Sequence, residues 1–294
     1  PHVAEDPEGS SHYGYGWVVV RTPAGKKVVT HSGGNGIFSA DFHHFVDDDV
    51  AIFLASSVAE MPAHAIARIW RPVLGEKLDV PPRAVDLDAA AIARLAGSYR
   101  LPSGGTIRVT ARGSSLLLEG AEAEAMAALL GAEGPDGKHR DLVARVEGIV
   151  RSAASGDFAP LHAAVRSSAP LEEFGKEKAP TWSRWKEELG AFRSVKAFAR
   201  PGRGDVVRSF ACLDFERGFR FLDYEWEGDE LTLARAMPQA PRREVFPESP
   251  ASFFSFDVPR WEAWKVRFEF DAYGAPARLV LPSGGGEVVA VRTP

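Results

Sequence analysis

The sequence is poor in several features that mark specialised classes of protein. Its one cysteine, Cys212, excludes an internal disulfide framework and any Cys-x-x-Cys metal knuckle. The longest apolar stretch, VAIFLASSVA at 50–59, is well short of the roughly 18 to 20 residues that a membrane-spanning helix needs. Lys and Arg number 35 against 40 Asp and Glu, which leaves no positive excess to hold a polyanion. We therefore expect no nucleic-acid partner and no membrane span.

The rest of the composition is that of an ordinary folded protein. Of the 294 residues 45% are hydrophobic and 26% are charged, with a net charge of -5. At about 100 to 200 residues per domain, this length suggests two domains or three small ones. The first residues, PHVAEDPEGSSHYGYGW, have no initiating Met, no basic region and no apolar region. We expect no export signal in them and expect the chain to begin inside a larger protein.

Patterns along the chain predict an α+β fold. Short β-rich runs between 13 and 58 alternate with turn residues, which is typical of an antiparallel meander. Apolar residues at offsets of three and four predict an amphipathic helix at 59–74. Asp86 or Asp88 can cap a short helix that follows, and strands continue to 120. We expect further helices at 122–130, 141–152, 158–165 and 179–189, and strands at 194–237 and 253–292.

The two strand-rich segments that flank the later helices are similar to each other. Leu-Pro-Ser-Gly-Gly occurs at 101–105 and again at 281–285. Helices gathered before a run of strands favour an α+β unit over a doubly wound sheet. We therefore predict an antiparallel sheet, and a small β-barrel interrupted by an α+β cone. The predicted domains are a sheet domain at 1–75, a linker at 76–88, the first part of the barrel at 89–138, the cone at 139–236 and the second part of the barrel at 237–294.

The most informative motif is His31-Ser32-Gly33-Gly34 at the end of a predicted strand. It follows the aromatic-glycine run YGYGW at 13–17 and a hairpin, and Gly36-Ile37-Phe38-Ser39 comes after it. This order resembles the last third of the penicillin-recognising serine hydrolase domain, a family of class C β-lactamases, esterases and D,D-peptidases. The family's third motif, Lys or His, then Ser or Thr, then Gly, lies on the edge strand that borders the catalytic cleft. Residues 1–75 thus resemble the C-terminal part of a transpeptidase-type domain.

The resemblance implies roles for the residues of this motif. It assigns His31 to hydrogen bonding and electrostatic support, Gly33 to close approach of the substrate, and the Gly34 N–H to one half of the oxyanion hole. Side chains alternate along a strand, so Ser32 faces away from His31, which weighs against a Ser32 nucleophile activated by His31. We take Ser32 and Asn35 as candidate substrate-binding residues. The plain alternative is a strand end with a glycine turn and an exposed histidine. The resemblance implies no cofactor and no metal.

Two motifs of the family are missing from the sequence. Its nucleophile lies in Ser-x-x-Lys and its second motif is Tyr-x-Asn or Ser-x-Asn, and both precede the third motif. Asn35 is the one asparagine of the chain, and a glycine stands two residues before it. The one Ser-x-x-Lys match, Ser183 to Lys186, comes after the third motif, and we take it as chance. We expect the missing motifs N-terminal to Pro1, and no turnover by the family mechanism from this chain as it stands.

The second half carries a weaker resemblance. RLAGSYR at 94–100, with the closing strands at 268–292, is similar to the small lipocalin-like barrel appended to these hydrolases. The segment 141–236 resembles a nuclear-transport-factor-type cone, in which we expect packing rather than a ligand pocket.

Smaller features have simpler interpretations. His43 and His44 face opposite sides of a strand without a carboxylate on a shared face, so we expect one packed and one exposed histidine rather than a metal site. The run Asp47 to Asp49 lacks the pattern of a calcium loop and predicts a solvated hairpin tip. The tryptophan pairs three residues apart indicate core or inter-domain packing: Trp182 with Trp185, and Trp261 with Trp264.

The leading hypothesis is the C-terminal segment of a serine hydrolase that acts by acyl transfer on an amide, lactam or ester. The intact protein would take a small-molecule or peptidoglycan-like substrate, and the resemblance implies an extracytoplasmic location. The alternative is a non-catalytic binding or oligomerisation module, because an incomplete sheet exposes an edge that pairs with a partner or a second copy.

Overall fold

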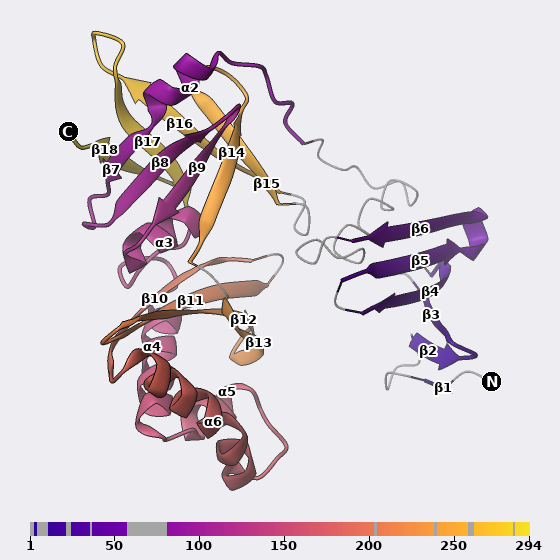
Figure 1. Ribbon diagram of the computed structural model, residues 1–294. Coiled ribbons are helices and arrows are strands. Elements are labelled where there is room, and N and C mark those ends of the chain that lie inside the picture. The colour runs from indigo at the N-terminus through magenta and orange to yellow at the C-terminus, as the bar shows by residue number, and fades with distance from the viewer. Residues whose placement is uncertain are drawn as a thin grey trace. The chain divides into compact units, whose positions relative to one another are not determined.

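The computed structural model describes residues 3–4, 11–21, 25–35, 37–57, 81–202, 205–237, 240–257, 262–284 and 286–294. It confirms a mixed α+β fold with antiparallel sheets and one closed barrel (Figure 1). The chain forms two compact units: residues 1–82 with 256–263, and residues 83–255 with 264–294. The helix predicted at 59–74, residues 76–80 of the predicted linker and Trp261 lie outside the described residues. No helix in the described ranges is long and apolar enough to cross a membrane.

The first unit contains the predicted meander. The six strands described in it pair in chain order, each with the next. Tyr15 and Gly16, both with positive φ, form the tight turn between the second and third strands. Val28 and Phe45 are the buried apolar side chains in its described part. The strands are β1 (Val3–Ala4), β2 (Ser11–Gly14), β3 (Trp17–Arg21), β4 (Lys27–Gly34), β5 (Ser39–Phe45) and β6 (Val50–Ser56).

The second unit contains an eight-stranded barrel made from both ends of its chain. The order around the barrel is β14-β15-β16-β17-β18-β7-β8-β9, and pairing of β9 with β14 closes it. The strands are β7 (Gly97–Arg100), β8 (Thr106–Arg112), β9 (Ser115–Gly120), β14 (Arg242–Pro247), β15 (Ser252–Asp257), β16 (Glu262–Phe270), β17 (Pro276–Ser283) and β18 (Gly286–Arg292). Helix α2 (Ala89–Leu95) precedes them, and the Asp88 carboxylate accepts the N–H of Ala90 as its predicted cap.

The last strand of the chain binds back to the first strand of the barrel. In the register of β18 with β7, Arg292 lies opposite Tyr99. The Arg292 guanidinium donates to the carbonyls of Ala96 at 2.7 Å and Arg94 at 3.1 Å, and it lies over the Tyr99 ring. The Tyr99 hydroxyl donates to Leu95 at 2.8 Å. The RLAGSYR segment and the terminal Val-Arg therefore meet where the barrel closes.

The remaining part of the second unit is a four-stranded antiparallel sheet with helices on one face (Figure 1). Its strands pair in chain order: β10 (Phe192–Pro201), β11 (Val206–Phe215), β12 (Gly218–Glu227) and β13 (Glu230–Met237). An apolar core joins that face to α4 (Arg140–Ser155), α5 (Ala159–Ala164) and α6 (Leu171–Leu189). The other face packs against α3 (Ala123–Leu130) through Met126, Phe198 and Phe210. We call this sheet and its three helices the layer.

The layer is joined to the barrel within one compact unit. Glu133 and Ala199 exchange two backbone hydrogen bonds of 2.8 Å, and the Arg243 guanidinium donates to the Leu129 carbonyl. The division of this unit at 138/139 and 236/237 stays a prediction, because the barrel and the layer lie within one contact unit.

Helix α6 begins eight residues earlier than the sequence predicts. The sequence predicts its start near Ala179. Instead the helix begins at Leu171 and runs through Pro180. Burial of Phe174 in the core and the i,i+4 ion pair of Glu172 with Lys176 support the added turns. Packing of the apolar face thus outweighs the hydrogen bond that proline removes.

Candidate functional site

The motif His31 to Gly34 lies on a part of β4 that pairs with a neighbouring strand on only one of its two edges. β4 is an interior strand in the sheet order, whereas the family pattern places the motif on an edge strand. However, the pairing of β4 with β3 ends at Thr30, opposite Val18, while its pairing with β5 continues to Gly34. Among the described strands, the motif therefore pairs with β5 alone. The expected edge exists at the second half of β4 and not along the whole strand.

The direction of the backbone N–H groups follows from the turn after the motif. The N–H of Asn35 donates to the Phe38 carbonyl at 3.0 Å, on the β5 side. Successive N–H groups of a strand point to opposite sides. The Gly34 N–H is therefore directed to the uncovered side of β4, where no described strand accepts it. A backbone donor at such a position is available to an incoming oxygen.

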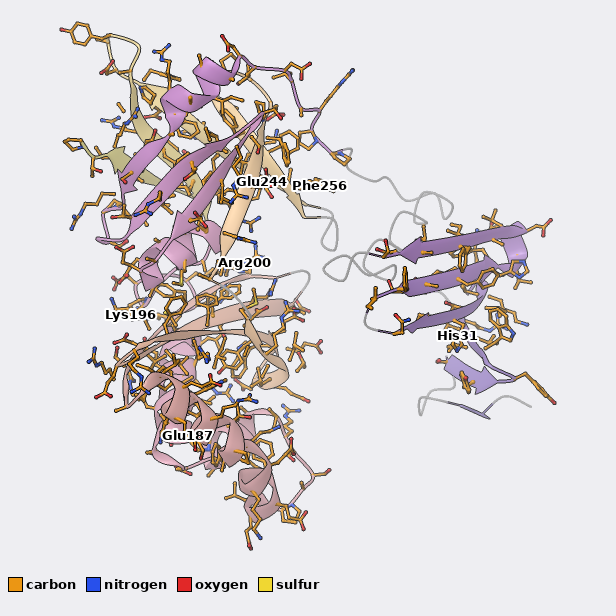
Figure 2. All side chains as sticks on the ribbon, viewed as in Figure 1. His31, Glu187, Lys196, Arg200, Glu244 and Phe256 are labelled. Atoms are coloured by element: carbon orange, nitrogen blue, oxygen red, sulfur yellow. The ribbon has the colours of Figure 1, made fainter. Side chains whose placement is uncertain are left out.

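Aromatic side chains surround the exposed imidazole of His31, which Figure 2 labels on the first unit. The ring centroid of Trp17 lies 6.4 Å from that of His31, edge to face, and the centroid of Tyr13 lies 6.5 Å away. Phe42, opposite His31 in the register, packs on Trp17 at 5.3 Å. Trp17 and Tyr13 are 40% and 43% exposed. The run YGYGW thus supplies the surroundings of His31, a role that the sequence did not assign to these two side chains.

The two glycines of the motif differ in what requires them. A Cβ on Gly34 would lie 3.0 Å from the carbonyl oxygen of Phe38, so the tight turn explains that glycine. A Cβ on Gly33 would have no atom within 4 Å, and the φ of Gly33 is not positive. Neither packing nor backbone conformation in the described chain explains Gly33. A larger side chain at position 33 would stand in open space.

Asn35 holds the turn after the motif. Its side-chain oxygen accepts the N–H groups of Ile37 at 3.1 Å and Phe38 at 2.8 Å. These two hydrogen bonds form an Asx turn and use the side-chain carbonyl of Asn35. The side-chain amide group of Asn35 is left for the predicted contact with substrate. Beside the turn lies an open hollow of about 560 Å³, whose lining includes Gly33, Gly34 and Asn35 but neither His31 nor Ser32.

The opposite face of the sheet corrects the prediction for the histidine pair. Asp41 is 4% exposed and lies opposite Ser32, and its carboxylate lies 2.8 Å from Nε2 of His43. The expectation of no carboxylate on a shared face is wrong, because Asp41 lies two residues before His43 and side chains two apart share a face. His43 and His44 are both partly buried, so the expectation of one packed and one exposed histidine is also wrong.

The aspartate run joins the turn between β5 and β6 to the start of β4. The Asp48 carboxylate pairs with the Lys26 ammonium at 2.6 Å, and Asp47 accepts the backbone N–H of Lys27 at 2.8 Å. The described residues contain no group of three or more His, Cys, Asp or Glu side chains that could hold a metal.

The Ser-x-x-Lys match lies on the surface of α6. Ser183 is exposed, and the Lys186 ammonium donates to the Ala154 carbonyl at the end of α4, at 2.8 Å. Trp182 and Trp185 on the same helix are 9% and 8% exposed and pack edge to face at 5.2 Å, which confirms their packing role.

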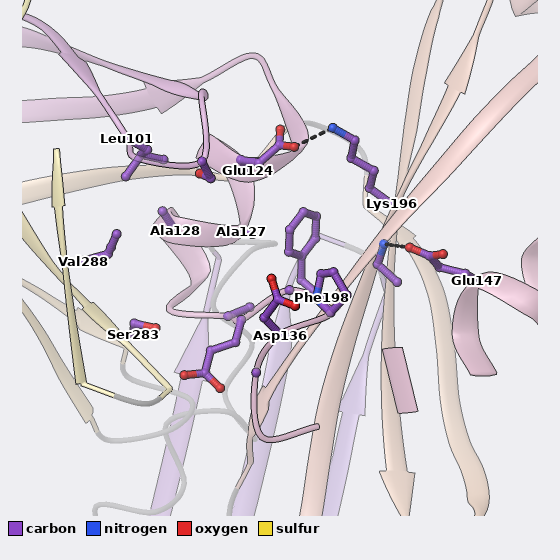
Figure 3. Close-up of a pocket in the computed structure, with 17 residues that line it drawn as sticks. Leu101, Glu124, Ala127, Ala128, Asp136, Glu147, Lys196, Phe198, Ser283 and Val288 are labelled. Atoms are coloured by element: carbon purple, nitrogen blue, oxygen red, sulfur yellow. Dashed lines mark hydrogen bonds and ion pairs between the residues drawn. The ribbon is translucent and has the colours of Figure 1, made fainter. Parts of the chain in front are cut away.

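A second cavity, of about 560 Å³, lies where the barrel meets the layer (Figure 3). Lys196 pairs with Glu124 across it, and Glu147 accepts the N–H of Ala197 at 3.1 Å. Phe198 and Ala127 supply apolar lining. The Lys196–Glu124 pair thus links α3, beside the barrel, to β10 of the layer, which is what a structural seam requires.

Comparisons with known proteins give a partial match. The chain is 32% identical over 115 residues to penicillin-binding protein 4* of Bacillus subtilis, which covers 36% of this chain and 26% of that protein. The octameric penicillin-binding protein homologue from Pyrococcus abyssi aligns with 82% of this chain and 38% of its own, at 12% identity and a TM-score of 0.27. No protein family model matches the chain.

These matches set the level at which the chain can be described. It is similar in sequence to part of a penicillin-binding protein, and it spans about a quarter of that protein's length. The structural alignment has a TM-score too low to support an argument about fold.

Proposed function

We propose that this chain supplies one wall of the catalytic groove of a serine hydrolase of the penicillin-binding type. The proposed reaction is acyl transfer: a serine hydroxyl attacks the carbonyl of an amide, lactam or ester, and water then hydrolyses the acyl-enzyme. The observation that carries the proposal is the unpaired edge of β4 at Gly33. Neither a close contact nor a positive φ in the described chain accounts for a glycine at this position. The sequence similarity to a penicillin-binding protein supports the same class.

The proposed roles follow the geometry of β4. The Gly34 N–H, on the uncovered side, donates to the oxyanion that forms when the carbonyl is attacked. His31 contributes hydrogen bonding and electrostatic support from the exposed face, held by Trp17 and Tyr13. Ser32 and the amide of Asn35 are proposed contacts for substrate outside the reacting bond. The nucleophile and general base are proposed to belong to the part of the intact protein that carries the first two family motifs.

The proposed substrates are small molecules or peptidoglycan-like chains, and the proposed location of the intact protein is extracytoplasmic. We further propose that the barrel and the layer correspond to lipocalin-like and cone-like accessory regions of these hydrolases. No cofactor enters the proposed reaction.

The test is hydrolysis of nitrocefin and of p-nitrophenyl acetate by the intact protein. We expect His31→Ala to lower kcat/KM by about 100-fold, as loss of an oriented electrostatic group does. His44→Ala is the matched control, because His44 lies on β5 opposite Val29, where β3 still covers β4. We expect it to retain activity within about threefold. Full activity of His31→Ala, or equal loss in both variants, contradicts the proposed site.

A non-catalytic binding or oligomerisation module is the second candidate. Three large apolar side chains of the first unit are exposed: Ile37 at 63% and Phe38 at 58% in the turn after the motif, and Phe53 at 66% on β6. Exposed apolar side chains on an open sheet favour a partner or a second copy. Inactivity of the intact protein, together with a dimer in light scattering that Phe53→Ser dissociates, would favour this candidate over the hydrolase.

A further inference from the structure

The cavity where the barrel meets the layer is larger than the contacts across it require. Its volume of about 560 Å³ lies within the range of small-molecule sites. It is not the inside of the barrel, because fully buried side chains such as Ile107, Leu118 and Phe253 fill that space. It lies beside β10, the edge strand of the layer, and its lining includes no residue of α5 or α6. The cavity is therefore a feature of the junction and of neither part alone.

One wall of this cavity is apolar and comes from both structures that meet there. Leu101 and Val288 belong to the barrel, Ala127 and Ala128 to α3, and Phe198 to β10. The alanines of α3 leave open the space that longer side chains would fill. An apolar molecule in this space would be removed from water by the barrel, by α3 and by the Phe198 ring together. The cavity can therefore hold an apolar body.

The charged groups of the lining are four carboxylates and one ammonium. The ammonium is that of Lys196, and it pairs with Glu124. Glu147 pairs with Arg151, one turn further along α4. The contacts across the junction thus use the one ammonium and two of the four carboxylates.

The other two carboxylates, Glu133 and Asp136, pair with no cation in the described part of the chain. The side chain of Glu133 is nevertheless held in place, and its carboxylate accepts the N–H of Lys138 at 3.2 Å. Two glycines make room for it. A Cβ on Gly137 would lie 2.5 Å from the Cβ of Glu133, and a Cβ on Gly284 would lie 3.3 Å from its carboxyl carbon. A carboxylate fixed in this way, with one backbone donor, can accept further hydrogen bonds.

The number of free carboxylates indicates the kind of ligand. Two carboxylates supply too few oxygen ligands for a calcium site. An organic ammonium group, in contrast, has three N–H donors and can bind both Glu133 and Asp136. The ring of Phe198, which lines the same cavity (Figure 3), also attracts a cation placed over its face. Charge and lining together therefore favour a cation with an apolar body.

We propose that this cavity binds a small organic amine, in which an apolar or aromatic body carries a protonated amino group. The body packs against Phe198 and the alanines of α3. The ammonium group donates to Glu133 and Asp136. This site belongs to the second unit and does not rest on the proposed hydrolase function.

The test uses two matched ligands on the whole chain at neutral pH. 1-Naphthylmethylamine carries an ammonium group, and 1-naphthalenemethanol has the same ring system with a neutral hydroxyl. We expect one equivalent of the amine to bind, about fivefold more tightly than the alcohol, which is the scale of a partly exposed ion pair. Isothermal titration calorimetry measures both affinities.

A pair of charge variants assigns this preference to the cavity. Glu133→Gln keeps the shape of the side chain and an acceptor for Lys138 but removes the charge. We expect it to abolish most of the preference for the amine and to leave the affinity for the alcohol unchanged. Glu187→Gln is the matched control, because Glu187 is an exposed carboxylate of α6 outside the lining (Figure 2) and its loss changes the net charge equally. We expect it to keep the full preference.

A pair of bulk variants locates the apolar body. We expect Val288→Phe to raise the Kd of both ligands at least about fivefold, because its ring occupies the space that the ligand needs. Val291→Phe is the control, because Val291 is 54% exposed and lies on the other face of β18. It should bind both ligands as the wild type does.

Three results would overturn the proposal. The first is equal affinity of the wild type for the amine and the alcohol. The second is a preference for the amine that survives Glu133→Gln or falls equally in Glu187→Gln. The third is an unchanged Kd for both ligands in a folded Val288→Phe variant. If thermal unfolding shows that Val288→Phe does not fold, the comparison of Glu133→Gln with Glu187→Gln decides.

Discussion

The two compact units solve the problem of strand edges in different ways. In the second unit, eight strands close on themselves and a layer packs on the barrel, so one unit holds nearly all the buried apolar side chains of the described chain. In the first, an open sheet has Val28 and Phe45 as its buried apolar side chains in the described part. A closed barrel has no edge to protect, whereas an open sheet needs another surface. The proposed site therefore lies on the unit whose described part buries the fewest apolar side chains and leaves strand edges unpaired.

Separating the units gives the largest expected effect. We expect a fragment of residues 83–294 to unfold cooperatively in urea, with a midpoint close to that of the same transition in the whole chain. We expect a fragment of residues 1–82 to show no cooperative transition, because its described part buries too little apolar surface to offset the loss of chain entropy. Circular dichroism during urea titration measures both. A cooperative transition in the shorter fragment would remove the contrast.

A buried charge network tests the core of the second unit. Asp223 is fully buried and accepts from both Arg208 and Arg235. We expect Asp223→Ala to lower the free energy of unfolding by about 3 to 5 kcal/mol, because it leaves the buried Arg208 without its main partner. Asp229, whose side chain is 93% exposed and pairs with Arg145, is the control, and we expect Asp229→Ala to change stability by less than about 0.5 kcal/mol. Equal effects in chemical denaturation would show that burial is not the cause.

Barrel closure should have the next largest effect. We expect Arg292→Ala to cost about 2 to 4 kcal/mol of unfolding free energy, because two carbonyls at the end of α2 lose a charged donor. Arg278, exposed on the neighbouring strand, provides the matched variant, for which we expect less than about 1 kcal/mol. The comparison is sharpened if amide exchange in β7 and β18 accelerates in Arg292→Ala and the layer stays protected.

The one thiol reports on the second unit alone, and its effect is the smallest. Burial raises the pKa of Cys212 to about 11, with Asp214 and Glu124 adding to the shift and Lys196 opposing it. The folded state thus holds the proton more tightly than an unfolded chain, whose thiol pKa is about 8.5. The stability this provides is present below that value and is lost as the pH rises towards the folded pKa. We expect the urea midpoint of the wild type to fall more steeply than that of Cys212→Ala over this range.

A good share of the fold could be predicted from local pattern. The cap at Asp88 and the alternation of strands and turns depend on neighbouring residues, and each is found in the structure. The start of α6 could not be predicted in this way, because it depends on the burial of Phe174 in a core built from distant strands.

The site was predictable in part for the same reason. The motif at 31–34 was visible as a motif, but its exposed edge depends on where β3 begins relative to β4, and register is a tertiary property. The pair of Asp41 with His43 could have been found from their spacing of two in a strand.

The pairing of β9 with β14 has a consequence for the history of the chain. Glu119 and Arg242 are register partners, yet more than a hundred residues separate them in sequence. The chain therefore leaves and re-enters the barrel at adjacent points, as a guest domain does when it is spliced into the loop of a hairpin. This is the geometry expected of a segment inserted into a β-hairpin of the barrel.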